Sequence, residues 1–510
     1  MNGEHASPSG AARVLILGLG ESGCAAARWC ARGGAALRLA DTRAEPGGLD
    51  ALRRDLAAAP VEYRLGASAF DAGLLEGVDQ VVLSPGLPPA QPPLSGLLEQ
   101  ARAAGIEVVG EIELFARALA ELARSQEYEP RILAVTGTNG KTTVTALARH
   151  LVEAAGLSVR AAGNIGPAAL AALMDALDAQ SLPQVWVLEL SSFQLATTRS
   201  LRADAAAVLN VTQDHLDWHG DMAGYAAAKA GIYAGARIAV VNRDDPLVAA
   251  MVESLDARRV RSFGRDLPAL VGDMGLDHSH GVGWLAAAEP LDFEETETPP
   301  PRRRKPAPPP PRATGRTVRL MPADALRIRG LHNALNAQAA LLLARSLDLG
   351  WGPLLRAVGD YAGEPHRMAF VRSIGSVDFI DDSKGTNVGA TVAGLEGLGR
   401  KVVLIAGGLG KGQDFSPLAA AAARHARAVL LIGQDGAEIG RALEGAGVSG
   451  EAAASLEDAV DRALDLAQPG DAVLLSPACA SMDMFRNYAH RGQAFARAVE
   501  EAALQRGEVA

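Results

Sequence analysis

Residues 135–143 read VTGTNGKTT and lie between an apolar run, ILAV, and an amphipathic run, TTVTALARHLVEA. A strand, a glycine-rich loop and a helix in this order can bind phosphate, because the loop amides and the helix N-terminus point at the anion. The common pattern G-x-x-x-x-G-K-[ST] requires glycine at position 135, where this chain has Val135. The stretch is therefore a damaged loop, a chance string or a different variety of phosphate loop.

Other residues that could act with this loop follow apolar runs further along the chain. Lys141 would neutralise phosphate charge, and the Thr142 hydroxyl would reach Mg²⁺. Glu189 ends the run VWVLE, and His215 follows the run AAVLN. A carboxylate and an imidazole at strand ends beside a phosphate loop suit metal binding. His215 has a structural alternative, and its neighbour His219 could be mistaken for the ligand.

Lysine is scarce in this chain, which makes its positions informative. Six lysines stand against 43 arginines (49 − 6), at positions 141, 229, 305, 384, 401 and 411. Lysine serves where arginine cannot, as a point charge on phosphate or as a reactive amine. Lys229 would repel a nearby metal pair unless its amine had become a carbamate by reaction with CO₂. The alternatives are a random distribution of lysines and a surface lysine on an Ala-rich helix.

A second glycine-rich turn, GLGESG, occupies residues 18–23 after the run VLIL. A full G-x-G-x-x-G after a strand, with Asp41 ending the next strand, is typical of NAD binding. The same backbone can hold the diphosphate of another nucleotide, such as UDP. The two interpretations predict different protein classes, an oxidoreductase and a nucleotide-sugar enzyme.

Length and composition predict a cytoplasmic enzyme of about three domains. The chain has 510 residues, a net charge of −10 and three scattered cysteines. The charge argues against a nucleic-acid partner, and the cysteines predict a reducing compartment without disulfides. The N-terminal apolar run is too short to span a membrane and lacks a basic flank, so we expect no membrane association.

Apolar runs rich in β-branched residues alternate with Ala/Leu-rich helical patterns throughout the chain. This alternation predicts an α/β class with parallel sheets covered by helices, and binding sites beyond the carboxyl ends of the strands. We predict domains at 1–110, 111–363 and 364–510. The Pro/Arg-rich stretch at about 287–315 cannot bury a core, so we expect a disordered, exposed insertion inside the second domain.

Several motifs together resemble the Mur ligases, ATP-dependent amide-forming enzymes of peptidoglycan synthesis, over nearly the whole chain outside 265–325. In that family GTNGK is the normal phosphate loop, so the loop is intact. The motifs that carry the resemblance are TGTNGKTT, GNIG (163–166), LELSSFQL, NVTQDHLD, YAAAKAGIY, RGLHNALNAQAA, GEPHRMAF, FIDDSKGTNVGAT, GGLGKGQDF and LSPACASMDMFRNYAHRG. SPG, LELSSFQL, DDSKGTN and SPACASMD look most like the branch that adds D-glutamate to UDP-N-acetylmuramoyl-L-alanine.

The resemblance implies a Rossmann-like UDP domain, a central phosphate-loop ATPase domain and a Rossmann-like C-terminal domain that holds the amino acid. For ATP it implies Gly137, Thr138, Asn139, Gly140, Lys141, Thr142, Thr143, Asn333, Asn336, Arg367 and Asp382. For two Mg²⁺ ions it implies Thr142, Glu189, His215 and carbamylated Lys229. Lys141, Glu189, His215 and Lys229 would form the catalytic set.

For the UDP-sugar substrate the resemblance implies Ser22, Asp41, Thr42, Arg43, Gly86, Asn164 and His215. For D-glutamate it implies Lys384, Thr386, Lys411, Ser481 and Tyr488, so that two cations meet two carboxylates. Two positions depart from the family pattern. Tyr488 stands where phenylalanine is usual, and Leu409 replaces an aspartate.

The implied reaction passes through an acyl phosphate, and the implied protein is a monomer. No covalent enzyme intermediate is required, so the lack of a Ser/His/Asp or Cys/His triad signature is expected. The general base for the amine is not readable from the sequence. Rival interpretations are the ligases that add L-alanine or a diamino acid, folylpolyglutamate synthetase, a dehydrogenase and a nucleotide-dependent scaffold.

Overall fold

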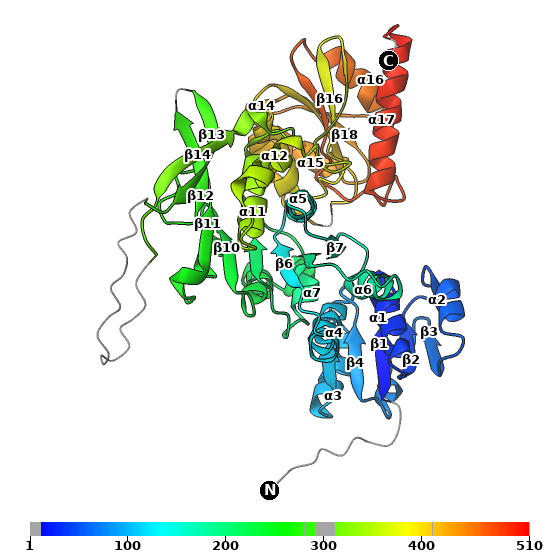
Figure 1. The fold of residues 1–510 in the computed structure, drawn as a ribbon. Helices are drawn as coiled ribbons and strands as arrows, with labels where there is room; N and C mark the ends of the chain where they lie inside the picture. The colour runs from blue at the N-terminus through cyan, green and yellow to red at the C-terminus, as the bar shows by residue number, and fades with distance from the viewer. Residues whose placement is uncertain (1–11, 280, 292–311, 411, 509–510) are drawn as a thin grey trace.

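The computed structural model describes residues 12–279, 281–291, 312–410 and 412–508. Three α/β units follow one another along the chain, each built on its own main sheet (Figure 1). The predicted α/β class with parallel sheets is confirmed. We propose domain borders at 110/111 and 363/364, between successive sheets.

The N-terminal sheet is parallel, in the order β3-β2-β1-β4-β5. The strand order reverses beside β1, and the crevice beyond the ends of β1 and β4 is where such sheets bind ligands. The turn GLGESG lies at this point. The elements are β1 (Arg13–Leu17), α1 (Glu21–Arg32), β2 (Ala36–Asp41), α2 (Leu49–Asp55), β3 (Val61–Leu65), β4 (Gln80–Leu83), α3 (Leu94–Ala103) and β5 (Glu107–Val109).

The central sheet is also parallel, in the order β11-β10-β9-β6-β8-β7. The chain builds one side of β6 first and then crosses to the other, so the ends of β6, β8 and β9 meet at a switch point. The strands are β6 (Arg131–Thr136), β7 (Val159–Gly163), β8 (Val185–Glu189), β9 (Ala205–Val208), β10 (Ile238–Asn242) and β11 (Val260–Phe263).

Helices cover both faces of this central sheet, as the near-continuous apolar strands require. They are α4 (Glu111–Gln126), α5 (Lys141–Ala154), α6 (Ala169–Asp178), α7 (Ser192–Leu195), α8 (Leu216–His219), α9 (Met222–Ala230), α10 (Pro246–Ala250), α11 (Leu331–Arg345) and α12 (Trp351–Asp360). Short 3₁₀ turns lie at Ala72–Leu75, Gly231–Tyr233, Ala257–Arg259 and Ala323–Ala325.

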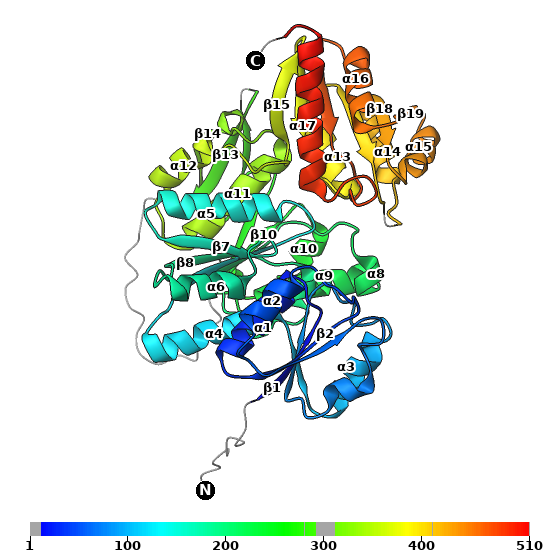
Figure 2. The ribbon, with the colours of Figure 1, turned by 90° about the vertical axis from the view of Figure 1, so that its right-hand side faces the viewer.

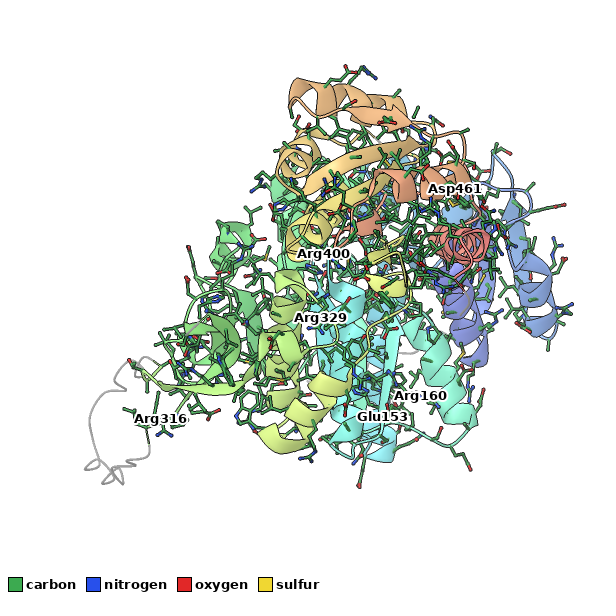
Figure 3. All side chains as sticks on the ribbon, turned by 90° about the horizontal axis from the view of Figure 1, so that it is seen from above. Glu153, Arg160, Arg316, Arg329, Arg400 and Asp461 are labelled. Atoms are coloured by element: carbon green, nitrogen blue, oxygen red, sulfur yellow. The ribbon has the colours of Figure 1, made fainter. Side chains whose placement is uncertain are left out.

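A three-stranded antiparallel sheet flanks the central unit: β12 (Met274–Ser279), β13 (Val282–Glu289) and β14 (Arg316–Pro322). Figure 3 shows Arg316, where β14 begins, at the outer edge of the molecule. The prediction of a disordered insertion at about 287–315 was wrong at both edges. Residues 287–289 belong to β13, and Arg312 forms a buried ion pair with Asp273 at 2.5 Å. The rest of that prediction, at 292–311, lies outside the described residues.

The third sheet has the order β15-β16-β20-β17-β18-β19, with only β15 antiparallel to its neighbour. Its strands are β15 (Ala369–Ile374), β16 (Val377–Asp381), β17 (Val402–Gly407), β18 (Ala426–Ile432), β19 (Gly450–Ala452) and β20 (Ala472–Leu475). Its helices are α13 (Val388–Gly397), α14 (Ser416–His425), α15 (Gly436–Gly445), α16 (Leu456–Leu466) and α17 (Tyr488–Gln505).

The two junctions between the units differ in chemistry. A single apolar core runs through the N-terminal and central units, where α1, α4 and α6 pack together (Figure 2). The third unit has apolar cores of its own, made only of residues after 368. Across this second junction Asn387 donates its side-chain N–H to Asn139 Oδ1 at 3.0 Å. The first junction therefore has an apolar core shared by both units, and the second joins units with separate cores and carries a polar contact.

No helix among the described residues is both long and apolar enough to cross a bilayer.

The buried carboxyl of Glu111 at the first junction predicts a pH-dependent stability. Burial raises its pKa to about 7, against the hydrogen bond from Leu170 N–H at 2.5 Å, and the nearby charge of Glu21 adds to the rise. The folded protein therefore holds this proton longer than the unfolded chain, so stability falls as pH rises from about 4.5 to about 7.

Glu111→Gln should remove that loss, because the amide oxygen still accepts the Leu170 N–H and carries no charge. Thermal unfolding should show a gain of at most about 3 kcal/mol at pH 8 and little change at pH 5. The exposed Glu99 of α3 supplies the control variant Glu99→Gln. A gain of equal size at both pH values would contradict this account.

Candidate active site

The phosphate loop joins β6 to α5 and is anchored from neighbouring strands. Asn139 N–H donates to Asn210 Oδ1 at 2.8 Å, and Thr138 Oγ1 accepts the Thr212 N–H at 3.0 Å. Gly140 precedes α5 with φ of 82°, and a methyl group there would lie 2.6 Å from Asn336 Oδ1. Only glycine fits this position, because both the backbone and the neighbouring amide exclude a side chain.

Two lysine amines meet behind this loop. Lys141 Nζ donates to the carbonyls of Gly137 and Thr138, both at 2.9 Å, and Lys229 Nζ donates to the same Gly137 carbonyl at 2.8 Å. Burial and then the charge of Lys141 hold the pKa of Lys229 well below its usual value, although Asp214 opposes them. Burial also lowers the pKa of Lys141. Lys229 is 1% exposed and stands 4.6 Å from the centre of the Tyr225 ring.

Glu189 lies at the end of β8 and is 1% exposed. Its Oε1 accepts the Asn164 side-chain N–H at 2.6 Å, and its buried Oε2 has no hydrogen-bond partner among the described residues. An ionised carboxylate oxygen left without a donor in a buried site is costly unless a cation binds there. Its donor chemistry therefore fits a hard metal ion such as Mg²⁺.

His215 and His219 occupy different places on the next segment. His215 lines the cavity described below, with φ of 54°, and its Nε2 stands 3.5 Å from Asp214 Oδ2. His219 Nε2 pairs with Ser192 Oγ at 2.9 Å. Among the described residues, no three His, Cys, Asp or Glu side chains form a metal-binding group. The predicted Mg²⁺ ligands are not a group of this kind. Only Glu189 and His215 belong to those four residue types, and the other two predicted ligands are the Thr142 hydroxyl and a carbamate on Lys229.

A cavity of about 480 Å³ lies between the central and third units. It brings together residues from the phosphate loop, from the ends of β8 and β9 and from the start of the third unit. The predicted site residues that line it are Thr138, Asn139, Gly140, Lys141, Thr142, Asn164, Glu189, His215, Arg367, Lys384 and Thr386. Lys229 is not among them, because its amine lies behind the loop.

A second chamber of about 300 Å³ shares Asn139, Gly140, Arg367 and Lys384 with the first. It adds Thr143, Asn333, Asn336 and Asp382 from the predicted ATP residues. Asn336 donates to Asn333 Oδ1 at 3.1 Å, and both lie in the first turns of α11. Burial raises the pKa of Asp382 to about 7, against hydrogen bonding from Ser476 at 2.7 Å and the charge of Arg367.

The predicted amino-acid residues are brought together in part. Lys384 Nζ lies 3.7 Å from the centre of the Tyr488 ring, and burial, aided by repulsion from Arg367, lowers its pKa to about 8. Thr386 lines the larger cavity, whereas Ser481 is buried at 4% exposure. Lys411 lies outside the described residues. Leu409 N–H donates to the Ala480 carbonyl at 2.9 Å.

Asn387 and Gln413 are among the cavity residues that were missed from the sequence. The Gln413 side chain donates to the Gly410 carbonyl at 2.9 Å and accepts the Val388 N–H at 3.1 Å. Asn387 caps α13 by accepting the Ala390 N–H and also contacts Asn139. Their motifs, DDSKGTN and GKGQDF, were recognised, but nothing marks which amides within them bridge loops.

The N-terminal site residues gather around the switch point of the first sheet. Asp41 accepts the Leu19 N–H at 2.7 Å and is paired with Arg43 at 2.7 Å. Burial would raise the pKa of Asp41, but hydrogen bonds from Arg43 and Leu19 outweigh it and lower the value. Ser22 lies in the first turn of α1. Thr42 and Gly86 follow the ends of β2 and β4.

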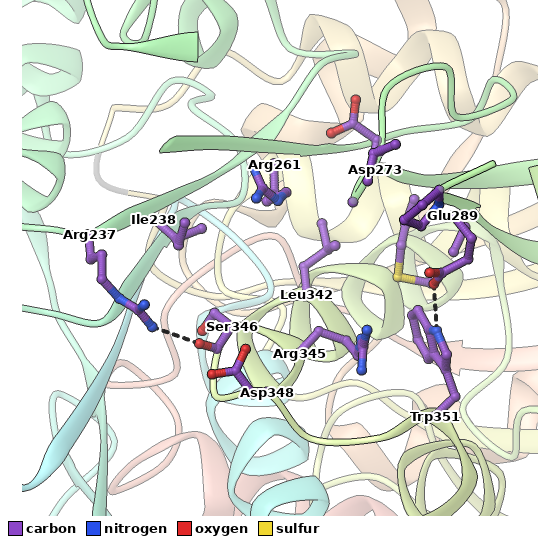
Figure 4. Close-up of a pocket in the computed structure, with 15 residues that line it drawn as sticks. Arg237, Ile238, Arg261, Asp273, Glu289, Leu342, Arg345, Ser346, Asp348 and Trp351 are labelled. Atoms are coloured by element: carbon purple, nitrogen blue, oxygen red, sulfur yellow. Dashed lines mark hydrogen bonds between the residues drawn. The ribbon is translucent and has the colours of Figure 1, made fainter. Parts of the chain in front are cut away.

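A separate cavity of about 320 Å³ lies between the C-terminal end of α11 and the three-stranded sheet (Figure 4). Arg237 donates to the Ser346 carbonyl at 2.9 Å, and Trp351 donates its indole N–H to Glu289 at 2.7 Å. Arg345 lies 4.8 Å from the centre of the Trp351 ring. None of the predicted site residues that the structure describes lines this cavity, so it is distinct from the cleft.

Comparisons with known proteins agree with this arrangement. Three family models match in order: the MurD-like N-terminal domain of Mur ligases at 12–110, the Mur ligase middle domain at 135–282, and the Mur ligase glutamate ligase domain at 366–479. Among solved structures, MurF ligase from Thermotoga maritima in complex with ADP has a TM-score of 0.55 at 16% identity, covering 85% of this chain and 91% of that one. Folylpolyglutamate synthase from Mycobacterium tuberculosis complexed with ADP has a TM-score of 0.54 at 17% identity, covering 79% and 97%. These likenesses show the fold.

The chain belongs to the Mur ligase family, the class of protein that the three units and their cleft define. It is 71% identical over 511 residues to the UDP-N-acetylmuramoylalanine–D-glutamate ligase of Bordetella bronchiseptica, covering 100% of both chains. It is 55% identical over 507 residues to the protein of that name from Ralstonia nicotianae, covering 99% of both chains.

Gly140→Ala should weaken nucleotide binding, because its methyl group would strike Asn336 at the junction of loop and helix. We expect the Kd for ADP, measured by calorimetry, to rise at least about tenfold, the equivalent of about 1.4 kcal/mol.

Gly156→Ala is the matched control, since Gly156 has φ of 90° but no atom within 4 Å of the added methyl group. It should lower the unfolding free energy by about 1–2 kcal/mol through backbone strain alone and leave the Kd unchanged. Equal effects of both substitutions on ADP binding would remove the steric explanation.

Proposed function

We propose that this protein is an ATP-dependent ligase that joins D-glutamate to UDP-N-acetylmuramoyl-L-alanine in peptidoglycan precursor synthesis. The observation that carries the proposal is the cleft in which the phosphate loop and Glu189 face Lys384 and Thr386 of the third unit. The substrates come from the names of the relatives, which match this chain from end to end. We further propose that it acts as a cytoplasmic monomer.

The reaction begins at the carboxylate of the alanyl group. One of its oxygens attacks the γ-phosphorus of ATP, the bond from that phosphorus to the bridging oxygen breaks, and ADP leaves. The product is an acyl phosphate. Lys141 is placed to turn from the loop carbonyls to the phosphate, whose negative charge restores the ammonium form that burial disfavours. Arg367 lines both chambers and can stabilise the same charge.

The amide forms in the second half of the reaction. The amine of D-glutamate attacks the acyl carbon, the bond from that carbon to the phosphate oxygen breaks, and inorganic phosphate and a proton leave. Lys384 would bind a carboxylate of D-glutamate, and that negative charge would stabilise the lysine's charged form. We propose Lys411, Thr386, Ser481 and Tyr488 as further contacts for the amino acid.

Magnesium fits the residues at the loop. We propose that Thr142, Glu189, His215 and a carbamate on Lys229 would hold two Mg²⁺ ions, which spread the charge of the transferring phosphoryl group when bound. The unpartnered Glu189 Oε2 supports this proposal. So does the depressed pKa of Lys229, because only a neutral amine adds to CO₂.

The first experiment is phosphate release from ATP and Mg²⁺ with UDP-N-acetylmuramoyl-L-alanine and, in turn, D-glutamate, L-glutamate, L-alanine and diaminopimelate. We expect release only with D-glutamate, accompanied by the amide product. Release with another amino acid would keep the ligase class and overturn the substrate. No release with any of them would overturn the proposed function.

Lys229→Ala tests the carbamate. We expect turnover to fall at least about a thousandfold, the scale seen when one stabilising group for a transition-state charge is removed. Excess acetate or formate should restore part of it by supplying the missing carboxylate. Lys401→Ala removes a lysine whose amine donates to the Arg424 carbonyl on the surface of the third unit, and it should leave turnover unchanged. Full activity of Lys229→Ala would end the carbamate proposal.

A further inference from the structure

Helix α6 begins without a side-chain cap of its own. The preceding residue is Ala168, whose methyl group accepts no hydrogen bond. Two carboxylates from other elements accept hydrogen bonds from the backbone N–H groups at the start of α6 instead. Glu21 accepts the Ala168 N–H at 3.0 Å, and Glu111 accepts the Leu170 N–H at 2.5 Å. Carboxylates are favoured at helix N-termini, where the amides and the helix dipole present positive charge.

Glu21 belongs to the turn GLGESG, whose backbone we expect from the sequence to hold the diphosphate of UDP. This turn is tightly packed. Ser84 Oγ donates to the Gly18 carbonyl at 2.6 Å, and a methyl group on Gly23 would lie 1.9 Å from that carbonyl oxygen. Glu21 lies within this turn and is also the first residue of α1, so the packing of the turn holds its backbone in place.

Ala168 belongs to the other half of the substrate site. Its loop begins at Gly163, whose N–H donates to the Pro167 carbonyl at 2.9 Å. The neighbouring Asn164 is bonded twice to Glu189, through its backbone N–H to the Glu189 carbonyl at 2.8 Å and through its side chain to Oε1 at 2.6 Å. Glu21 is therefore connected to the loop that carries Asn164 by two hydrogen bonds, Ala168 N–H to Glu21 and Gly163 N–H to the Pro167 carbonyl, with short stretches of backbone between them.

A second contact joins the same helices at their far ends. Arg32, at the end of α1, pairs with Asp178, at the end of α6, at 2.6 Å. Both side chains are largely exposed, so this pair contributes little to stability. The helices thus run side by side with one polar contact near the substrate site and one remote from it, which supplies an internal control.

We propose that Glu21 is a positioning residue, which fixes the uridine-diphosphate turn at a set distance from the loop of Asn164 so that one substrate can occupy both. This rests on the proposed function, together with the expectation that the uridine-diphosphate part of the substrate binds at the turn GLGESG and the muramoyl part near Asn164. A single ligand that bridges two sites gains affinity from the second only if their spacing is already correct.

Four variants separate this role from its alternatives. Glu21→Ala removes the acceptor of the Ala168 N–H. Glu21→Asp keeps the negative charge, but its side chain is one methylene too short to accept this N–H. Glu21→Gln keeps an oxygen in place without the charge. Asp178→Ala breaks the remote contact between the same helices. The readouts are the calorimetric Kd for UDP alone, which probes the first unit only, the Kd for UDP-N-acetylmuramoyl-L-alanine, and the KM for that substrate.

We expect Glu21→Ala and Glu21→Asp to raise the Kd and KM of the whole substrate about tenfold, the effect of losing one hydrogen bond to a charged group. Glu21→Gln should stay within about threefold of the unmodified protein. The Kd for UDP should stay unchanged in all four variants, and Asp178→Ala should change none of the values.

Three results would overturn the proposal. An unchanged whole-substrate Kd in Glu21→Ala would show that the contact is dispensable. An equal change in the Kd for UDP would make Glu21 act on the nucleotide itself. An equal effect of Asp178→Ala would assign the result to helix docking in general. If the unmodified protein binds the substrate but forms no amide with D-glutamate, the proposed function fails, while the comparison of Kd values still decides the role of Glu21.

Discussion

The amines of Lys141 and Lys229 donate to the same backbone carbonyl, that of Gly137, and this close approach of two amines constrains the rest of the site. Burial disfavours the ammonium forms of both Lys141 and Lys229, and repulsion from Lys141 adds to this effect at Lys229. Nearby negative charge is therefore needed to stabilise the ammonium forms of these amines. The carboxylates that surround the loop, Glu189 and Asp214, act on Lys141 from the ends of neighbouring strands. A bound triphosphate would complete the same balance, which explains why a nucleotide site is built here.

The two junctions between units differ in how firmly they hold the units that they join. The N-terminal and central units share one apolar core, and the carboxylate of Glu21 caps α6 across that junction. Such a junction holds its two sides in a constant relation, which suits a long substrate bound at both ends. The third unit has its own cores and meets the phosphate loop through the contact between Asn139 and Asn387. Units that keep separate apolar cores can move relative to each other.

The sequence predicted the fold class and the family because those depend on local patterns. The run ILAV, the loop and the helix after it appear in the structure as β6, the loop and α5, since strand, turn and helix signals are all short-range. The width of the Pro/Arg-rich insertion was wrong at its edges. Ala287 and Ala288 read as part of a polar segment, but they are buried because β13 pairs on both sides.

The cross-chain contacts could not be predicted in the same way. Asn139 and Asn387 lie 248 residues apart, and Glu21 reaches Ala168 across 147. Amides and carboxylates are common on any surface, so nothing in the local pattern marks these particular ones. Their roles follow only when sheet order brings distant loops together. The orphaned oxygen of Glu189 is similar, since only its burial distinguishes it from an ordinary strand-end acid.

The contact between Asn139 and Asn387 has a consequence for the order in which substrates add. A cleft made from two separately folded bodies loses conformational freedom when it closes, and the first ligand to contact both bodies bears most of that entropic cost. Arg367 lines both chambers, and in the proposed function it would give a nucleotide that contact from the third unit. A later ligand then meets a pocket that is already assembled. Sequential addition, with the nucleotide ahead of the amino acid, is the kinetic pattern that this architecture favours.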